Sequence, residues 1–302
     1  MKKILILLFL LLFFFFISKN DTKQQADSLS ENIIYMELSK TKDIVELEFE
    51  EYLKGVLYAE MPSNFDIEAL KAQAVAARTY TIKKLSTSNH ICDNPSHCQA
   101  WKDPTASNDY EKLSIAVEET KNENITYLGE PIEAFFHSSS GGKTENSENV
   151  WVSKKPYLIS VESPGEEKIM SSFYSNVEFS YKDLANRINS YKNKKLITDT
   201  NLKNKIKILS LTEGNRVKEI KIQDSIFSGT EIRSILGLRS ANFTVSLNKN
   251  SIIFNVAGFG HGVGMSQWGA EVMAQNGNNY KEILSHYYPG TMIQSIKNDI
   301  LY

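Results

Sequence analysis

The chain has 302 residues, with 34 basic and 36 acidic side chains and a formal net charge of −2 at pH 7. Because no strong basic excess is available to neutralise phosphates, nucleic acid is not an expected partner. The locally basic segment 182–207 is interpreted as a solvated surface rather than a contact for a polyanion.

The N-terminus carries a hydrophobic segment. Lys2 and Lys3 precede an unbroken apolar run over residues 4–17, and a polar stretch follows it. The run is longer than many secretory signal cores but shorter than the roughly 20 residues that span a membrane. Because no small-x-small cleavage site follows, we expect an uncleaved signal anchor, with a cleaved signal peptide as the alternative. The protein is therefore expected in the cell membrane as a single-pass protein, with the rest of the chain on the extracytoplasmic side.

The stretch 51–85 predicts two helices joined by a tight turn. Apolar side chains recur at helical spacing in its first part, and Pro62 has no amide hydrogen with which to continue that helix. Glu60 therefore lies at the corner between the helices. On the second helix, Lys71 and Arg78 lie two turns apart on one face, so we expect the Glu60 carboxylate to face two cations.

Turn-forming residues place the other elements of the chain. A polar, glycine-rich segment at 135–148 is expected to be a loop held by strands, where functional side chains tend to lie. Strands are expected at residues 33–38, 43–49, 125–128, 132–136, 206–212, 217–223, 243–247 and 252–256. Further helices are expected at residues 109–121, 181–191, 230–236, 266–276 and 280–288.

Two histidines and two cysteines lie close together at His90, Cys92, His97 and Cys98. Thiolate and imidazole are ligands that zinc prefers, so we expect a structural zinc site held by these side chains, with water or another residue as the alternative to His90. The spacing does not match a standard zinc knuckle. Outside the cytoplasm, a Cys92–Cys98 disulfide is the main alternative, followed by free thiols.

Glu60 is the sharpest candidate for an acid catalyst. The commonest role of such a glutamate is an ordinary ion pair, here with Lys71 or Arg78. However, the negative end of its helix and the apolar side chains beside it would raise its pKa, while the two cations would lower it. These opposing effects can tune a proton donor near neutral pH.

Glycines recur at every second residue from 258 to 264, with His261 in their middle. This spacing does not fit the G-x-G-x-x-G pattern of dinucleotide-binding loops. It implies backbone that passes close to another group or takes positive φ. His261 is therefore a candidate for lining a site, with a purely structural histidine as the alternative.

Several ordered motifs resemble the stage II sporulation protein D family, which also includes the amidase-enhancer proteins. They are YLKGVLYAEMP with EALKAQAVAARTY, then FFHSSSGGKTENSENVW, GFGHGVGMSQWGA and ILSHYYPGT, and the resemblance covers residues 33–293. The hydrophobic N-terminus is similar to that of the sporulation branch. The resemblance implies a lytic transglycosylase that acts, during engulfment, on peptidoglycan strands stripped of their stem peptides.

The resemblance also implies roles for individual residues. The family's catalytic glutamate precedes Met-Pro and falls on Glu60, which would act as both acid and base without a metal or a water nucleophile. Lys71 and Arg78 match the family's basic residues and would bind the muramyl lactate carboxylate. Contacts to sugar hydroxyls are expected from Ser138, Ser140, His261 and Gln267. Stacking on sugar rings is an option for Trp151, Tyr287 and Tyr288, although core positions are commoner for such side chains.

Partners and alternatives follow from the same resemblance. The implied partners are peptidoglycan glycan strands, a SpoIIP-like amidase or endopeptidase, and a SpoIIM-like membrane scaffold. Clostridial members hold zinc in the cysteine–histidine loop, which favours zinc over the disulfide here. Two other functions stay open: a noncatalytic wall-associated module that activates an amidase, and a zinc hydrolase built on residues 92–98.

We expect an α+β fold with two lobes and a substrate groove between them. The expected divisions are an anchor at 1–18, a tether at 19–32, a helix-rich catalytic lobe at 33–165, a smaller strand-rich lobe at 166–257, and a C-terminal segment at 258–302 that completes the groove.

Overall fold

The computed structural model describes residues 33–88 and 90–295. The expected anchor and tether lie outside these residues. Within the described part, none of the helices has both the length and the apolar character needed to cross a membrane.

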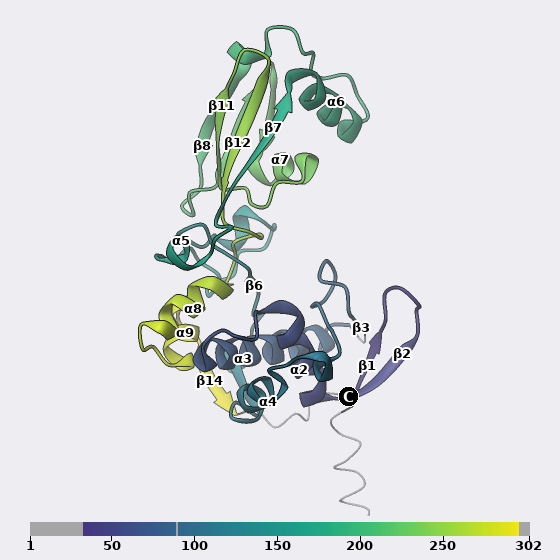
Figure 1. Ribbon diagram of the computed structural model, residues 1–302, viewed down its shortest axis with the longest axis vertical. Coiled ribbons are helices and arrows are strands. Elements are labelled where there is room, and N and C mark those ends of the chain that lie inside the picture. Colours follow the sequence, from purple (N-terminus) through teal and green to yellow (C-terminus); the bar gives the residue numbers. More distant parts are fainter. Residues whose placement is uncertain (1–32, 89, 296–302) are drawn as a thin grey trace, which may run out of the picture.

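The described residues form a mixed α+β fold, as expected (Figure 1). The helices are α2 Phe49–Glu60, α3 Ile67–Leu85, α4 Tyr110–Glu118, α5 Glu166–Ile169, α6 Tyr181–Lys192, α7 Gly229–Leu236, α8 Gln267–Gln275 and α9 Tyr280–Tyr287. The strands are β1 Ile33–Glu37, β2 Ile44–Glu48, β3 Ile91–Cys92, β4 Glu123–Tyr127, β5 Glu130–Pro131, β6 Phe136–His137, β7 Tyr174–Ser180, β8 Ile206–Leu211, β9 Val217–Ile222, β10 Ser225–Ser228, β11 Phe243–Leu247, β12 Ser251–Ala257, β13 Met265–Ser266 and β14 Met292–Ser295.

Two separate hydrophobic cores organise these elements. The larger core gathers α2, α3, α4, α8 and α9 with small sheets in the order β2-β1-β3 and β14-β4-β5. The smaller core lies under the sheets β10-β9-β8 and β11-β12-β7, with α6 and α7 packed against them. Figure 1 shows this strand-rich part at the top and the helices of the larger core at the bottom.

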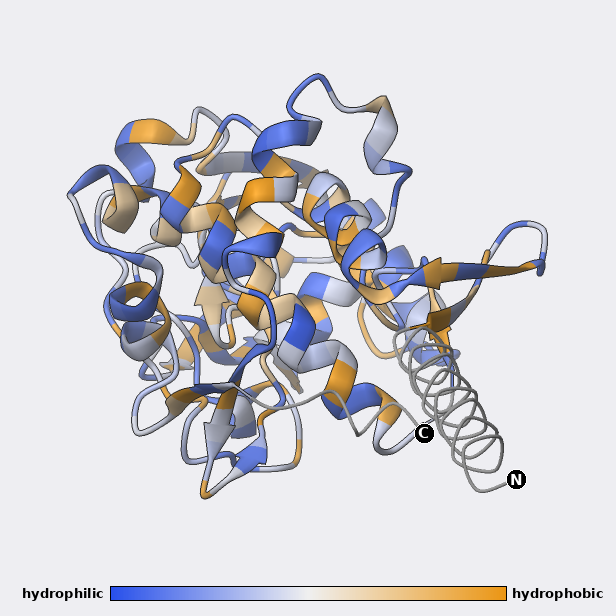
Figure 2. Ribbon diagram, turned by 90° about the horizontal axis from the view of Figure 1, so that it is seen from below, coloured by the Kyte–Doolittle hydropathy of each residue, from blue (hydrophilic) through white to orange (hydrophobic). Residues whose placement is uncertain are grey.

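Helix α3 is the centre of the larger core. Its N-cap Asp66 accepts a hydrogen bond of 2.9 Å from the amide of Glu68, and its alanine-rich surface is buried on nearly every side. Small side chains let other backbones approach closely, and α2, α4, α8, α9 and β4 all pack on α3. Figure 2 shows orange and blue segments along the same helices, so single helices carry both apolar and polar residues.

Most predicted elements are confirmed, with ends that differ by at most three residues. The helix pair, the N-terminal hairpin and the hairpins of the strand-rich part are all present. Strands β3, β5, β7, β10, β13 and β14 were not predicted. Four of the seven residues of β7 are polar, and β10 has only four residues, two of them serine. The predicted strand at 132–136 is wrong for most of its length, since only Phe136 belongs to a strand, β6.

Candidate active site

A cavity of about 880 Å³ lies in the described part of the chain. Its walls come from the end of α2, from α3, from the cysteine–histidine loop, from the polar loop 135–148 and from the glycine segment 258–264. Further lining residues come from the segment 150–158, from the start of α8 and from α7 in the strand-rich part. The sequence-predicted site residues that line the cavity are Glu60, His97, Cys98, Ser138, His261 and Gln267.

Glu60 is the last residue of α2 and lies in the cavity wall. Its Oε1 accepts a hydrogen bond of 2.6 Å from the amide of Ala100, in the segment that follows the cysteine–histidine loop. Burial raises the pKa of Glu60, and the Ala100 hydrogen bond opposes part of that effect. The carboxyl group therefore holds its proton more tightly than an exposed glutamate, as a proton donor requires.

The expectation that Glu60 faces Lys71 and Arg78 is not met. Arg78 is fully buried, and its Nη2 lies 2.7 Å from Oε2 of Glu50 on α2. Its Nη1 donates to the carbonyl of Thr120 at 2.8 Å. Lys71 forms ion pairs with two glutamates, Glu68 at 2.8 Å and Glu119 at 2.7 Å, and neither cation lines the cavity.

Arg78 does not reach Glu60 because the face of α3 that carries it is turned away from the cavity. Arg78 points toward α2 and the end of α4, where it satisfies carbonyl groups and a buried carboxylate. Tyr80 is about 200° further around the helix, at 100° per residue, and lines the cavity instead. Burial raises the pKa of Tyr80 to about 12, so its hydroxyl stays protonated.

The serines of the polar loop have different environments. Ser138 is half-buried and lines the cavity, as expected. Ser140 is fully buried and does not, because its Oγ donates to Glu166 Oε1 at 2.6 Å. Hydroxyl groups of Ser163 and Ser266 also donate to that carboxylate oxygen, at 2.7 and 2.9 Å. Ser140 therefore helps to hold the loop in place and is not placed to contact a ligand.

The glycine segment brings His261 beside the polar loop. The backbones of Ser139 and Phe259 exchange two hydrogen bonds of 2.9 Å. A side chain at Gly258 would lie 2.7 Å from the carbonyl oxygen of Ser139, and one at Gly264 would lie 2.0 Å from that of Phe135. Both glycines also have positive φ, at 76° and 73°, so the predicted need for glycine is confirmed.

His261 presents an uncharged ring to the cavity. Its Nδ1 accepts a hydrogen bond of 3.1 Å from the amide of Val263, so the proton of the neutral ring is on Nε2. Burial, together with the positive charges of Arg233 and Arg216, lowers the pKa of His261 to about 3. His261 is therefore a hydrogen-bond donor at physiological pH rather than an acid or a cation.

Of the three aromatic candidates, one lies at the cavity. Trp151 is 37% exposed, lines the cavity, and packs against Phe135 and His261 with ring-centroid distances of 4.5 and 5.1 Å. Tyr287 and Tyr288 are buried in the larger core at 1% and 0% exposure. The core interpretation is therefore right for both tyrosines, and Trp151 has a ring available to a ligand.

Sequence reasoning missed several polar lining residues, among them Tyr80, Glu133, Lys155 and Arg233. Tyr80 lies in the motif EALKAQAVAARTY, in which Lys71 and Arg78 were the residues predicted to contact a ligand. Glu133 and Lys155 pair with each other at 2.7 Å across the cavity wall, and nothing in their local sequence indicates this. Arg233 lies in the strand-rich part, far along the chain from any motif.

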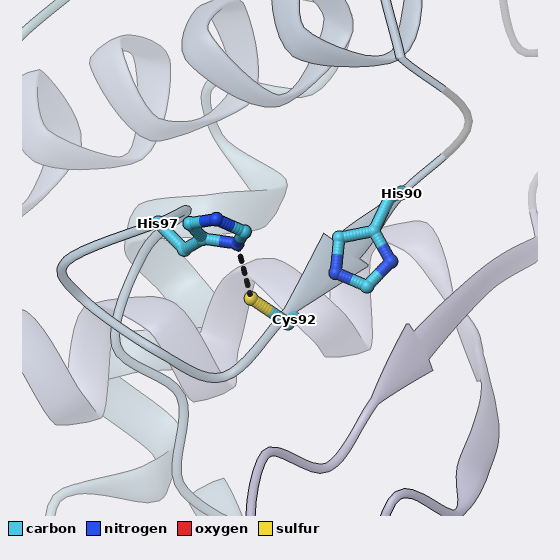
Figure 3. Close-up of side chains that lie close together, drawn as sticks. All are labelled: His90, Cys92 and His97. Atoms are coloured by element: carbon cyan, nitrogen blue, oxygen red, sulfur yellow. Dashed lines mark hydrogen bonds between the residues drawn. The ribbon is translucent and has the colours of Figure 1, made fainter.

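The cysteine–histidine loop brings its side chains together at one edge of the cavity. The ligand atoms of His90, Cys92 and His97 all lie within 4.8 Å of one another (Figure 3). The Sγ atoms of Cys92 and Cys98 are 3.4 Å apart, and both cysteines are free thiols rather than the alternative disulfide. Two sulfurs on one tetrahedral zinc lie about 3.8 Å apart, so the donor types and their spacing fit zinc.

Comparison with known proteins finds the same family that the sequence motifs resemble. A family model described as SpoIID, stage II sporulation protein, matches residues 37–127. The chain is 35% identical to stage II sporulation protein D of Bacillus amyloliquefaciens, over 90% of this chain and 82% of that protein. It is 33% identical to the protein of the same name from Bacillus subtilis, over 92% and 84%.

An amidase enhancer of Bacillus subtilis is also similar, at 32% identity over 80% of this chain and 40% of the enhancer. The family match and the two long alignments to sporulation proteins cover all the segments that line the cavity. The chain therefore belongs to the SpoIID family of stage II sporulation proteins.

Proposed function

We propose that this protein is a peptidoglycan lytic transglycosylase with a role in sporulation. It would cleave the bond between N-acetylmuramic acid and N-acetylglucosamine in strands without stem peptides. The observation that carries the proposal is Glu60, a carboxyl group with a raised pKa in the wall of a large cavity. Membership in a family of sporulation proteins, and similarity to an amidase enhancer, support a role at the cell wall.

One carboxyl group is sufficient for this reaction. Protonated Glu60 gives its proton to the glycosidic oxygen as the bond from that oxygen to C1 of the muramic acid breaks. The muramic acid's own C6 hydroxyl then attacks C1, and its proton passes to the Glu60 carboxylate. The products are a 1,6-anhydro end and a free C4 hydroxyl, and Glu60 is protonated again.

Several other residues of the cavity lining suit a substrate rich in hydroxyl groups. Ser138, Gln267 and neutral His261 offer uncharged hydrogen-bonding groups, and Trp151 offers a ring face for a sugar. Tyr80 supplies a hydroxyl whose high pKa keeps it a donor. These residues can bind sugar hydroxyls through uncharged groups, which cost less to remove from water than charged groups do.

We also propose a structural zinc ion at the cysteine–histidine loop. Cys92, Cys98 and His97 would be its main ligands, with His90 as the fourth. Zinc would stabilise the loop whose continuation donates to Glu60 through Ala100, and the chemistry above needs no metal. We further propose that residues 1–18 anchor the protein in the membrane, with the cavity on the extracytoplasmic side, near a partner amidase.

The second candidate function is a noncatalytic enhancer of an amidase, which the similarity to an amidase enhancer favours. One experiment separates the two. Full-length protein, purified in detergent, is incubated with peptide-free glycan strands, and the products are identified by mass spectrometry. A lytic transglycosylase releases 1,6-anhydro ends, and Glu60→Gln abolishes their release. If the parent protein releases none from these strands but accelerates a partner amidase on peptide-bearing strands, the enhancer function is right.

A further inference from the structure

Arg233 reaches the cavity from the strand-rich part of the protein. It lies in the last turn of α7, which ends at Gly237 with a left-handed φ of 67°. The Nε of Arg233 donates to the carbonyl of Leu238 at 3.3 Å, which fixes the side chain against the end of the helix. The guanidinium group is thus held in place, and its residue is part of the cavity lining.

The guanidinium of Arg233 has no acidic partner among the described residues. Its two terminal nitrogens make no hydrogen bond or ion pair there, whereas Lys155, in the same lining, is paired with Glu133 at 2.7 Å. Burial lowers the pKa of Arg233, so the surroundings already disfavour its charge. That charge also acts on His261 in the cavity wall, whose pKa it lowers.

A partly buried guanidinium without a counter-ion is a site for an anion. Removing a cation from water costs free energy, which an anionic ligand can offset. The planar arrangement of N–H groups matches a carboxylate, with two parallel hydrogen bonds from the terminal nitrogens. Arg233 has these nitrogens available, because its anchoring bond uses only Nε.

We propose that Arg233 binds the lactyl carboxylate of N-acetylmuramic acid and thereby selects glycan strands whose stem peptides have been removed. This inference rests on the proposed function and assigns its substrate specificity to one residue. A stripped strand has a free carboxylate on each muramic acid, whereas in a peptide-bearing strand the same carbon is part of a neutral amide. The two cations first expected in this role, Lys71 and Arg78, are paired elsewhere.

Binding measurements test the proposal without depending on cleavage. Full-length Glu60→Gln protein is titrated calorimetrically with three probes of equal length. They are peptide-free oligosaccharides, the same oligosaccharides with the lactyl carboxylates converted to primary amides, and peptide-bearing oligosaccharides. We expect the free carboxylate form to bind about 10- to 100-fold more tightly than the amide form, as for a hydrogen bond to a charged group.

Substitution of Arg233 should remove this preference. In Arg233→Gln, affinity for the free carboxylate form falls to that of the amide form, and affinity for the amide form does not change. Arg233→Lys keeps the positive charge without the paired geometry and should retain part of the preference. Arg187→Gln is the matched control, because Arg187 lies in the same part of the protein and is already paired with Asp183 at 3.0 Å.

Two results would overturn the inference. One is an Arg233→Gln protein with normal thermal unfolding that still prefers the free carboxylate as the parent does. The other is a loss of affinity for peptide-bearing strands as large as that for stripped strands, which would assign Arg233 to a peptide carboxylate. Failure of the proposed function looks different: the parent would prefer free carboxylates and cleave nothing.

Discussion

The amide of Ala100 and Oε1 of Glu60 are joined by a hydrogen bond of 2.6 Å. Ala100 follows Cys98 by two residues, so this hydrogen bond links the proposed catalytic carboxyl to the end of the cysteine–histidine loop. The hydrogen bond favours the charged form of Glu60, while burial favours the neutral form and has the larger effect. The position of this loop therefore bears on both the orientation and the protonation of Glu60.

The first prediction concerns Glu60 and pH. Its pKa is higher in the folded chain than in the unfolded one, so ionisation opposes folding, and the protein loses stability as pH rises through that interval. Glu60→Gln keeps an acceptor for the Ala100 amide without an ionisable group. We expect the variant to be inactive, yet at least as stable as the parent at pH 7. The difference in stability should disappear below about pH 4, where the Glu60 carboxyl is protonated in both the folded and the unfolded chain.

Urea unfolding at several pH values checks this prediction, and the rate of anhydro-end formation gives a second measure. The rate should fall as pH rises through the raised pKa of Glu60, because only the protonated form donates. A variant that is clearly less stable than the parent at pH 7 would show that ionised Glu60 stabilises the fold, which contradicts the upward shift of its pKa on folding.

The second prediction concerns Arg78. Arg78 and Glu50 form a buried ion pair, at 0% and 3% side-chain exposure, so removing one partner leaves the other charge unpaired in the core. Arg78→Met should lower the free energy of unfolding by about 3–5 kcal/mol. The double variant with Glu50→Gln should recover much of that loss, and cleavage per folded molecule should stay near the parent value.

Lys71→Met is the comparison for Arg78→Met. The glutamate partners of Lys71 are partly exposed, at 25% and 57% of the side chain, so the loss should be no more than about 1 kcal/mol. Urea unfolding measures both variants. A stable Arg78→Met protein with weakened binding of glycan strands would restore Arg78 as a substrate contact.

The contrast between Arg78 and Tyr80 shows what sequence can and cannot predict here. Helical spacing and Pro62 were sufficient to predict α2 and α3, because local geometry sets both. The face of α3 that meets the cavity could not be predicted from the sequence, because this helix is buried on nearly every side and has no polar face that would mark the cavity. Arg233 carries no local signal at all, because only the packing of the strand-rich part brings it to Glu60's cavity.

The third prediction concerns zinc. Purified protein should contain one zinc per chain by mass spectrometric metal analysis, and Cys92→Ala should contain none. Chelation should lower the melting temperature by about 5 °C or more, and added zinc but not magnesium should restore it. Cleavage should decline only as the protein melts. Immediate loss of cleavage at temperatures far below melting would instead favour a zinc hydrolase.

The last prediction concerns the second carboxylate of the cavity. Hydrolysis of a glycoside commonly uses two carboxyl groups, and Glu133 lines the same cavity as Glu60. Glu133 is paired with Lys155 at 2.7 Å, an arrangement that suits a structural ion pair at the rim, with both side chains about one-third exposed. Glu133→Gln should therefore retain the rate within about fivefold, as expected when a partly exposed pair worth up to about 1 kcal/mol is lost. Its products should still carry 1,6-anhydro ends. A rate loss as large as that of Glu60→Gln, with reducing ends as the parent's product, would assign the reaction to hydrolysis by both carboxyl groups.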